Sequence, residues 1–190
     1  IYPVCSTNMS TKKIALGFAC CSLLLAYTVN EINLHYLQKD GIKLRENQTV
    51  ITNDDVSYLN PFKVFVQTGS IYKGEHDKYI SLVRPPGYGI MYAAFAKISG
   101  FNNTLTCLKV FHLLLFGASV YCLFFIAFRV LKSRSMALIS TGVYAILPFS
   151  MGFLYYTLTE AVTPALVICY VFFLLKASEA GIMKTKRRHY

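Results

Sequence analysis

The sequence predicts an all-α integral membrane protein with four transmembrane helices and a large outer loop that contains juxtamembrane helices. Two observations lead to this fold class. Hydrophobic residues make up 55% of the chain, and the mean hydropathy of +0.45 is high for a soluble domain. Four long stretches also lack acidic and basic residues, and basic residues stand at the ends of these stretches, as topology signals do. A soluble enzyme is therefore excluded, and the net charge of +10 gives no reason to expect a nucleic-acid partner.

Each charge-free stretch is interpreted as a helix because backbone groups in lipid must form their hydrogen bonds internally. About 20 apolar residues are needed to cross the hydrocarbon core, with a range of about 17–25. Three stretches have this length, and the fourth reaches it if the Lys176 side chain extends to the interface. We treat residues 1–190 as a single membrane domain with helices at about 13–31, 107–131, 135–156 and 159–177.

The first stretch has an alternative interpretation as a signal peptide. Lys12 and Lys13 precede an apolar core, which is the pattern of such a leader. The sequence after the core, YTVNEINLHY, offers no clean cleavage site between small residues. A retained membrane anchor is therefore the preferred interpretation.

Charge asymmetry predicts the orientation of the helices. Basic residues precede the first helix, separate the second from the third, and follow the fourth, so all three groups can be cytoplasmic. The loop 32–104 then faces outside, and Glu160 lies at the outer end of the fourth helix. Most of the nine acidic residues belong to this outer side. The basic residues that carry the argument are Lys12, Lys13, Arg129, Lys132, Arg134, Lys176, Lys184, Lys186, Arg187 and Arg188.

The first part of the outer loop contains an adjacent pair of aspartates in the stretch NDDVSYL. Asn53 or Asp54 can cap a helix, with Asp55 near the positive end of its dipole. Gly69 is a plausible end for this helix. Pro61 should interrupt it, because a proline in a helix interior costs about 3 kcal/mol. Apolar residues at helical spacing predict the buried face: Tyr58, Phe62, Phe65 and Val66.

The second part of the loop reads SLVRPPGYGIMYAAFAKISGF. Arg84 precedes two prolines and a glycine, which stiffen and turn the chain. Residues 90–98 are apolar with helical spacing but too few to span a bilayer, so we expect a surface helix. Tyr88 and Tyr92 are most simply explained as aromatic side chains at the lipid–water interface.

These motifs, in this order, resemble a known family. The series NDDVSYL, QTGSIY and RPPGYGIMYAAFAKISGF, followed by YAILPFSMGFLYYTLTEAVTPALVICYVFFLLKA, is similar to the N-terminal part of polyprenyl-phosphate-dependent glycosyltransferases of the C superfamily. This group includes protein O-mannosyltransferases and the lipid A aminoarabinose transferase. The resemblance covers roughly residues 12–177 through short motifs. Family members have many more helices, which implies that this chain is a fragment of a longer protein.

The resemblance implies roles for six residues. Asp54 stands four residues before Tyr58 and matches the catalytic carboxylate of the family, and Asp55 matches a more variable second position. Arg84 to Tyr88 match an Arg-Pro-Pro-Gly-Tyr corner, although Gly89 replaces the proline that usually follows. Leu158-Thr159-Glu160 match a later motif. The implied catalytic residues are Asp54 and Asp55, and the implied substrate-binding residues are Arg84, Tyr58, Tyr88 and Glu160.

The implied reaction is an inverting sugar transfer from a polyprenyl-phosphate lipid at the outer face of the bacterial inner membrane. A carboxylate that serves as general base is typically worth 10²–10⁴-fold, which suits Asp54 if the acceptor is a hydroxyl. If the acceptor is already an anion, Asp54 would orient it instead. The leaving phosphate needs a cation, and the planar donors of Arg84 fit this role. The expected partners are the sugar lipid and membrane lipids.

No cofactor or metal is required by the sequence. A divalent cation on Asp54 and Asp55 is compatible with carboxylate chemistry, but no ligand cluster demands it. The six cysteines form no Cys-x-x-Cys pair and lie mostly in apolar stretches, so we expect small buried side chains with no disulfide set or metal site.

Each of these assignments has a structural alternative. Asp54 can be only a helix cap, and Arg84 can pair with a loop acid or a lipid headgroup. Glu160 suits a helix start through the dipole alone. His112, in an apolar helix, is more simply a hydrogen-bonded structural residue than a ligand. At the level of the whole chain the alternative is a non-catalytic membrane protein, such as a transporter fragment or a scaffold subunit, but the helices carry no mid-membrane acid of the kind transporters use.

Overall fold

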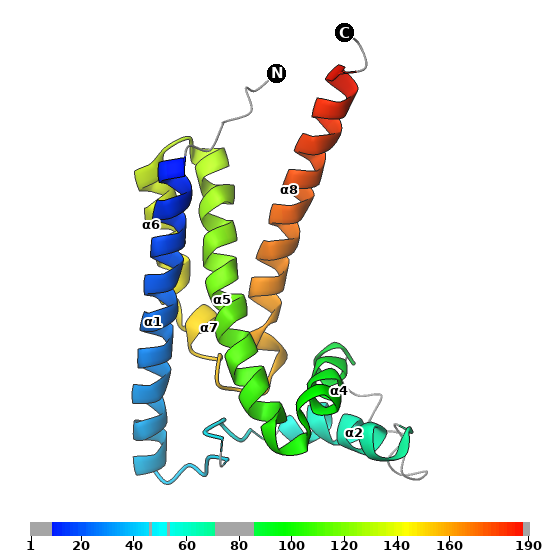
Figure 1. Ribbon diagram of the computed structural model, residues 1–190. Coiled ribbons are helices and arrows are strands. Elements are labelled where there is room, and N and C mark those ends of the chain that lie inside the picture. The colour runs from blue at the N-terminus through cyan, green and yellow to red at the C-terminus, as the bar shows by residue number, and fades with distance from the viewer. Residues whose placement is uncertain (1–8, 46, 53, 71–85, 188–190) are drawn as a thin grey trace.

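The computed structural model describes residues 9–45, 47–52, 54–70 and 86–187, and within these ranges the chain is almost entirely helical (Figure 1). Two isolated β-bridges pair extended residues outside the helices. They join Leu44 to Val50 and Val50 to Tyr156. The elements are α1 (Met9–Lys39), α2 (Asp55–Thr68), α4 (Gly87–Ser99), α5 (Phe101–Leu131), α6 (Arg134–Ile146), α7 (Pro148–Met151), the 3₁₀ helix η1 (Thr159–Ala161) and α8 (Thr163–Arg187).

Three helices in the described part are long and apolar enough to cross a membrane. They comprise Met9–Lys39, Phe101–Leu131 and Thr163–Ala180. This confirms the predicted all-α class with several candidate membrane spans. The predicted number of four spans is not confirmed. The first two helices run beyond the predicted boundaries of 13–31 and 107–131, so part of the predicted loop 32–104 is helical. The side of the membrane on which that loop lies stays a prediction.

The predicted single helix over 135–156 is wrong. Helix α6 ends at Ile146, because Pro148 has no N–H to donate and pushes Leu147 into an extended conformation, with φ −64° and ψ 134°. A 13-residue helix is about 20 Å long, which is less than the roughly 30 Å of hydrocarbon. The chain continues through the single turn of α7 and an irregular stretch to η1. The fourth predicted helix, 159–177, accordingly begins as η1 and becomes α8 only at Thr163.

Helix α5 is the centre of a bundle formed with α1, α6 and α8 (Figure 1). Small residues let α1 approach α5 closely: Ala15, Ala19 and Ala26 are buried along one stripe. On α5, a Cβ atom added to Gly117 would lie 2.9 Å from Leu23 Cδ1. Cys20 and Cys21, expected to be buried, are exposed on the surface of α1. Cys122 on α5 is buried.

Helices α2 and α4, which we call the cap, pack across the end of α5 near the start of α8 (Figure 1). The start of α1 and the end of α8 lie at the opposite end of the bundle. An aromatic cluster joins the cap to the bundle, and it consists of Tyr58, Leu59, Phe62, Tyr88, Tyr92, Ala93, Ala96, Leu108, Ala161 and Val162. The cap is the element that positions the predicted site residues.

Two predictions for the cap are wrong, and in both cases the cause is tertiary packing between its helices. Pro61 does not interrupt α2, which runs unbroken from Asp55 to Thr68 and ends as predicted at Gly69, with φ 75°. Pro61 is buried beside Phe62, so packing against α4 offsets the missing backbone donor. Tyr88 and Tyr92, expected at the lipid–water interface, are each only 2% exposed. A helix over the expected residues 90–98 is present as α4, but its tyrosines point into the cluster.

Candidate functional site

Asp54 occupies the N-cap position of α2 and is exposed. Its side chain makes no capping hydrogen bond. Its carbonyl oxygen instead accepts hydrogen bonds from the backbone N–H and the hydroxyl of Ser57, at 3.1 and 2.7 Å. Asp54 therefore stands at the predicted N-cap position without a capping hydrogen bond from its side chain. Asn53, the other residue predicted to cap the start of α2, lies outside the described residues, as does the side chain of Asp55.

Tyr58 and Tyr88 meet one helical turn beyond Asp54. Their rings make an edge contact, with centroids 6.1 Å apart and planes at 68°. Tyr58 is 7% exposed and belongs to α2, whereas Tyr88 belongs to α4. This pair fixes the start of α2 against the rest of the molecule. Both rings are buried, so they hold the start of α2 against α4.

His112 continues this contact into the bundle. Its Nδ1 lies 2.9 Å from the carbonyl oxygen of Leu154, and its Nε2 lies 3.3 Å from the Tyr88 hydroxyl. A carbonyl can only accept, so Nδ1 carries the proton and Nε2 of the neutral ring accepts from Tyr88. His112 is thus hydrogen-bonded, as its structural interpretation predicts. The chain of contacts ties the cap to the segment that precedes η1.

Glu160 lies in η1 and is exposed, with the Thr159 hydroxyl donating to Oε2 at 3.1 Å. The two residues that follow, Ala161 and Val162, pack into the same aromatic cluster as Tyr58 and Tyr88. The structure therefore places Asp54 and Glu160 at the same end of the bundle, each next to this cluster. Arg84, the predicted phosphate-binding cation, lies outside the described residues.

Sequence reasoning missed Arg45, in the link between α1 and α2. Its Nη1 donates to Thr49 Oγ1, the Val50 carbonyl and Thr157 Oγ1, at 3.2, 3.1 and 3.4 Å. Thr49 and Thr157 are buried, and the Val50 N–H donates to the Tyr155 carbonyl at 3.0 Å. Arg45 therefore fastens the link to the segment before η1. No local signal could reveal this, because Arg45 and Thr157 are separated by 112 residues.

Lys109 is a second missed cation at this end of the molecule. Its ammonium donates to the Asn47 carbonyl at 3.2 Å and lies 4.7 Å from the centroid of the Tyr155 ring. The Tyr155 hydroxyl in turn donates to Glu31 Oε1 at 2.7 Å. These contacts form a polar belt that joins α1, the link, α5 and the segment before η1. The belt places two cations beside the cap.

The positive charge of Arg45 affects the pKa of Tyr92 in the aromatic cluster. Burial raises the pKa of the Tyr92 phenol, and the positive charge of Arg45 partly opposes this rise. Tyr92 is therefore neutral at physiological pH. The described residues contain no group of three or more His, Cys, Asp or Glu side chains that could hold a metal. A divalent cation at Asp54 and Asp55 stays a prediction, because the Asp55 side chain is outside that set.

Comparison with protein-family models, curated proteins and solved structures gave no significant match to this chain. The resemblance to glycosyltransferases is carried by the sequence motifs given above.

Proposed function

We propose that this chain supplies the catalytic end of a glycosyltransferase that moves a sugar from a polyprenyl-phosphate donor to an acceptor. The observation that supports it best is the convergence of the sequence motifs at one end of a membrane bundle. Asp54 is exposed at the start of α2, one turn from Tyr58, which packs on Tyr88 and on the residues that follow Glu160. Carboxylates at the boundary between lipid and water would suit a reaction between a lipid-linked donor and a polar acceptor.

The proposed step is an inverting substitution at the anomeric carbon of the sugar. The acceptor hydroxyl oxygen attacks this carbon as the bond from the carbon to the phosphate oxygen breaks. The phosphate oxygen leaves with the bonding electron pair, and the Asp54 carboxylate takes the hydroxyl proton. For an acceptor that is already an anion, no proton moves and Asp54 orients the acceptor.

The leaving phosphate gains negative charge, so a cation must lie near it. Arg84 is the proposed cation. Among the described residues, Arg45 and Lys109 add positive charge at the same end of the bundle. Both are held by backbone carbonyls, so in this proposal they set the local potential while Arg84 contacts the phosphate.

Tyr58 and Tyr88, implied by the resemblance to bind substrate, are better suited to a positioning role. Their rings are buried and contact each other, and the Tyr88 hydroxyl is directed at His112. They would hold Asp54 at a fixed place relative to η1, which carries Glu160. The placement in the bacterial inner membrane is part of the same proposal and follows from the family resemblance, whereas the outward position of the cap follows from the charge asymmetry.

The test is sugar transfer by the membrane-embedded protein. Membranes that contain the chain would receive radiolabelled polyprenyl-phosphate mannose or polyprenyl-phosphate aminoarabinose, and labelled product would be counted. Asp54→Asn should lower the rate by about 10²–10⁴-fold for a hydroxyl acceptor. Asp40→Asn is the matched control, because Asp40 is an exposed aspartate that begins the turn after α1. Equal rates for the two variants at equal membrane levels would replace this proposal with the non-catalytic alternative.

A further inference from the structure

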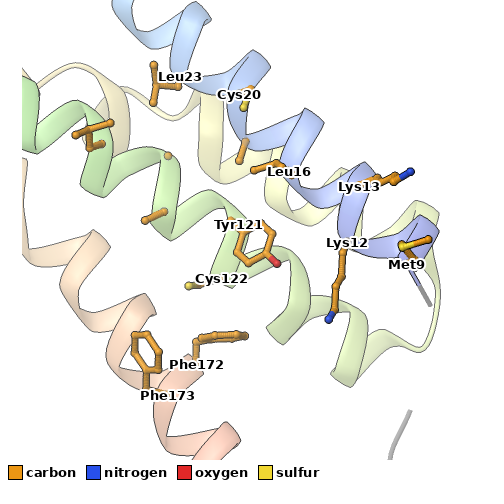
Figure 2. A pocket seen from close by; sticks show the side chains of 14 residues that line it. Met9, Lys12, Lys13, Leu16, Cys20, Leu23, Tyr121, Cys122, Phe172 and Phe173 are labelled. Carbon is orange, nitrogen blue, oxygen red and sulfur yellow. The ribbon is translucent and has the colours of Figure 1, made fainter. Parts of the chain in front are cut away.

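An open groove of about 550 Å³ lies between α1, α5 and α8, at the end of the bundle opposite the cap (Figure 2). This volume falls within the range of about 300–1,000 Å³ that small-molecule sites occupy. Its walls are almost wholly apolar, with Leu16 and Leu23 from α1 and Phe172 and Phe173 from α8. The groove lies between three helices that are long and apolar enough to cross a membrane, so lipid chains can reach it.

The groove has the length of one leaflet. From Lys12 at its rim to Leu23 at its far end, α1 rises by about 16 Å, roughly half of the 30 Å hydrocarbon thickness. Gly117 and Ala118 of α5 form part of the wall where side chains are smallest. An extended acyl chain that enters from the surface of one leaflet would therefore fit alongside α1.

The rim of the groove is cationic. Lys12 and Lys13 line it and are exposed, and in Figure 2 Lys12 extends on the side of α1 that faces α8 while Lys13 points away. The hydroxyl of Tyr121 and the thiols of Cys20 and Cys122 are the other polar groups among the labelled lining residues. A headgroup whose chain lies in the groove would meet the Lys12 ammonium.

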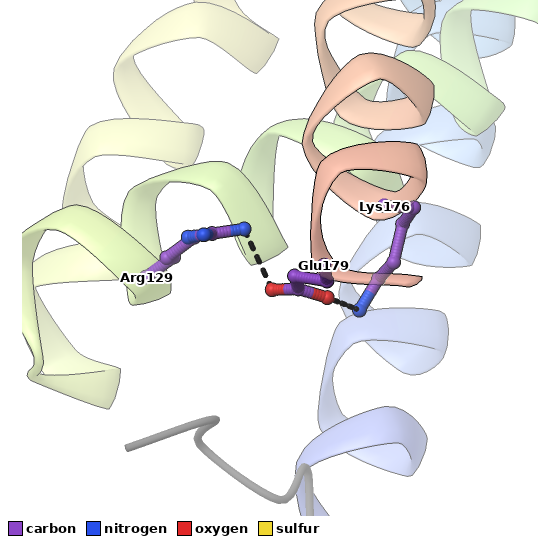
Figure 3. Close-up of polar contacts among 3 residues, drawn as sticks. All are labelled: Arg129, Lys176 and Glu179. Atoms are coloured by element: carbon purple, nitrogen blue, oxygen red, sulfur yellow. Dashed lines mark hydrogen bonds and ion pairs between the residues drawn. The ribbon is translucent and has the colours of Figure 1, made fainter. Parts of the chain in front are cut away.

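The acid on the neighbouring helix does not neutralise this lysine. Glu179 of α8 accepts from Arg129 Nη1 at 2.6 Å through Oε1 and from Lys176 Nζ at 3.1 Å through Oε2 (Figure 3). One carboxylate is thus shared by two cations, which leaves a net positive charge at this end of α5 and α8. The ion pair also fastens the α8 wall of the groove to α5.

We infer that this groove binds an anionic glycerophospholipid, with one acyl chain between α1 and α8 and the phosphate next to Lys12. A second copy of the chain is a poorer occupant, because its own α1 would bring the same lysines to the rim. An anionic lipid offers both the apolar chain and the opposite charge. The site is separate from the cap, and the inference does not rest on the proposed glycosyltransferase reaction.

The test compares two spin-labelled lipids, phosphatidylglycerol and phosphatidylcholine, in vesicles of phosphatidylcholine that contain the reconstituted chain. The immobilised fraction of each label gives its relative affinity for the protein. We expect phosphatidylglycerol to be preferred, and Lys12→Gln to lower the preference roughly fivefold. Lys132→Gln is the control for general surface charge, because Lys132 lies at the same end of α5 but does not line the groove.

A second variant tests the groove itself. Ala118 is exposed on the groove wall, so Ala118→Phe should fill the space and reduce the immobilised fraction of both labels. Ile139→Phe, on an exposed face of α6, is the control for an aromatic ring placed outside the groove. The inference is overturned if phosphatidylglycerol is not preferred, or if Lys12→Gln and Lys132→Gln act equally. It is also overturned if Ala118→Phe changes only self-association of the chain, because the groove would then be an interface between copies.

Discussion

The bundle and the cap are held together by different kinds of contact. In the bundle, α1 lies on α5 through a repeated stripe of small residues that includes Ala15, Ala19 and Ala26. In the cap, a few aromatic rings with fixed orientations, such as Tyr58 and Tyr88, make the contacts. A repeated stripe spreads the packing energy over many equivalent contacts, whereas a ring cluster depends on the shape of each member. The cap should therefore be the more sensitive region to a single added atom.

Matched glycine substitutions should expose this difference with the largest effect. A Cβ atom at Gly89 in the cap would lie 1.9 Å from Cδ2 of the Phe62 ring, and at Gly117 in the bundle it would lie 2.9 Å from the Leu23 methyl group. We expect Gly89→Ala to cost about 1–3 kcal/mol of stability through overpacking. Gly117→Ala should be near neutral, because a methyl tip can rotate away and alanine favours the helix by about 1 kcal/mol. Thermal unfolding in detergent would give both values.

A second substitution checks that the clash is the cause. Phe62→Ala removes the ring that an alanine at 89 would strike, so Gly89→Ala should be much less harmful in that background. A proline at position 89 also carries a Cβ atom, so it would not fit beside Phe62 in this packing. If Gly89→Ala and Gly117→Ala unfold at the same temperature, the proposed difference between the two regions is wrong.

The polar connection between the regions should give the next largest effect. Replacement of His112 by phenylalanine keeps a ring but leaves the Tyr88 hydroxyl and the Leu154 carbonyl without this partner, at a cost of about 1–3 kcal/mol. Because His112 joins the cap to the bundle, amide hydrogen exchange should rise in α2 and α4 more than in α1. Exchange measured by mass spectrometry would test this pattern.

The control for this variant is Tyr88→Phe. It removes one hydroxyl and leaves the bond from His112 Nδ1 to Leu154 in place, so its effect on exchange should be smaller. An equal or larger effect of Tyr88→Phe would mean that the Tyr88 hydroxyl stabilises the cap through contacts other than its contact with His112. Uniform exchange across α1, α2 and α4 in the His112 variant would instead mean that the cap is not a separate region.

The sequence predicted the two regions unequally well. The helices around 13–31 and 107–131 were predictable because an apolar stretch in lipid has no alternative to a helix. Their ends were not, since a helix continues past the point where hydrophobicity stops, as α1 does through Glu31 to Lys39. Pro148 is visible in the sequence, but the prediction treated the whole charge-free stretch as one helix.

The candidate site was predictable only in its local part. Helical spacing placed Asp54 and Tyr58 at the start of one helix, and both lie there. The burial of Tyr88 depends on His112, and the position of Arg45 depends on Thr157, both distant in the sequence. Contacts of this kind come from tertiary packing, which no periodicity encodes. The Tyr88 prediction failed for this reason.

The smallest effect is expected in the bundle, at the ion pair between Arg129 and Glu179. The side chain of Arg129 is 40% exposed, and exposed pairs contribute roughly 0–1 kcal/mol. Arg129→Gln should thus lower the unfolding temperature little, and 1 M salt should reduce the difference further by screening the pair. The Cys122 and Cys169 side chains offer a more local measurement, since one lies on α5 and the other on α8, near enough to influence each other. A mild oxidant should cross-link them equally well with and without Arg129, if packing of the bundle helices is sufficient to hold α8. A cross-link lost in Arg129→Gln would instead show that one directed contact governs α8, as directed contacts govern the cap.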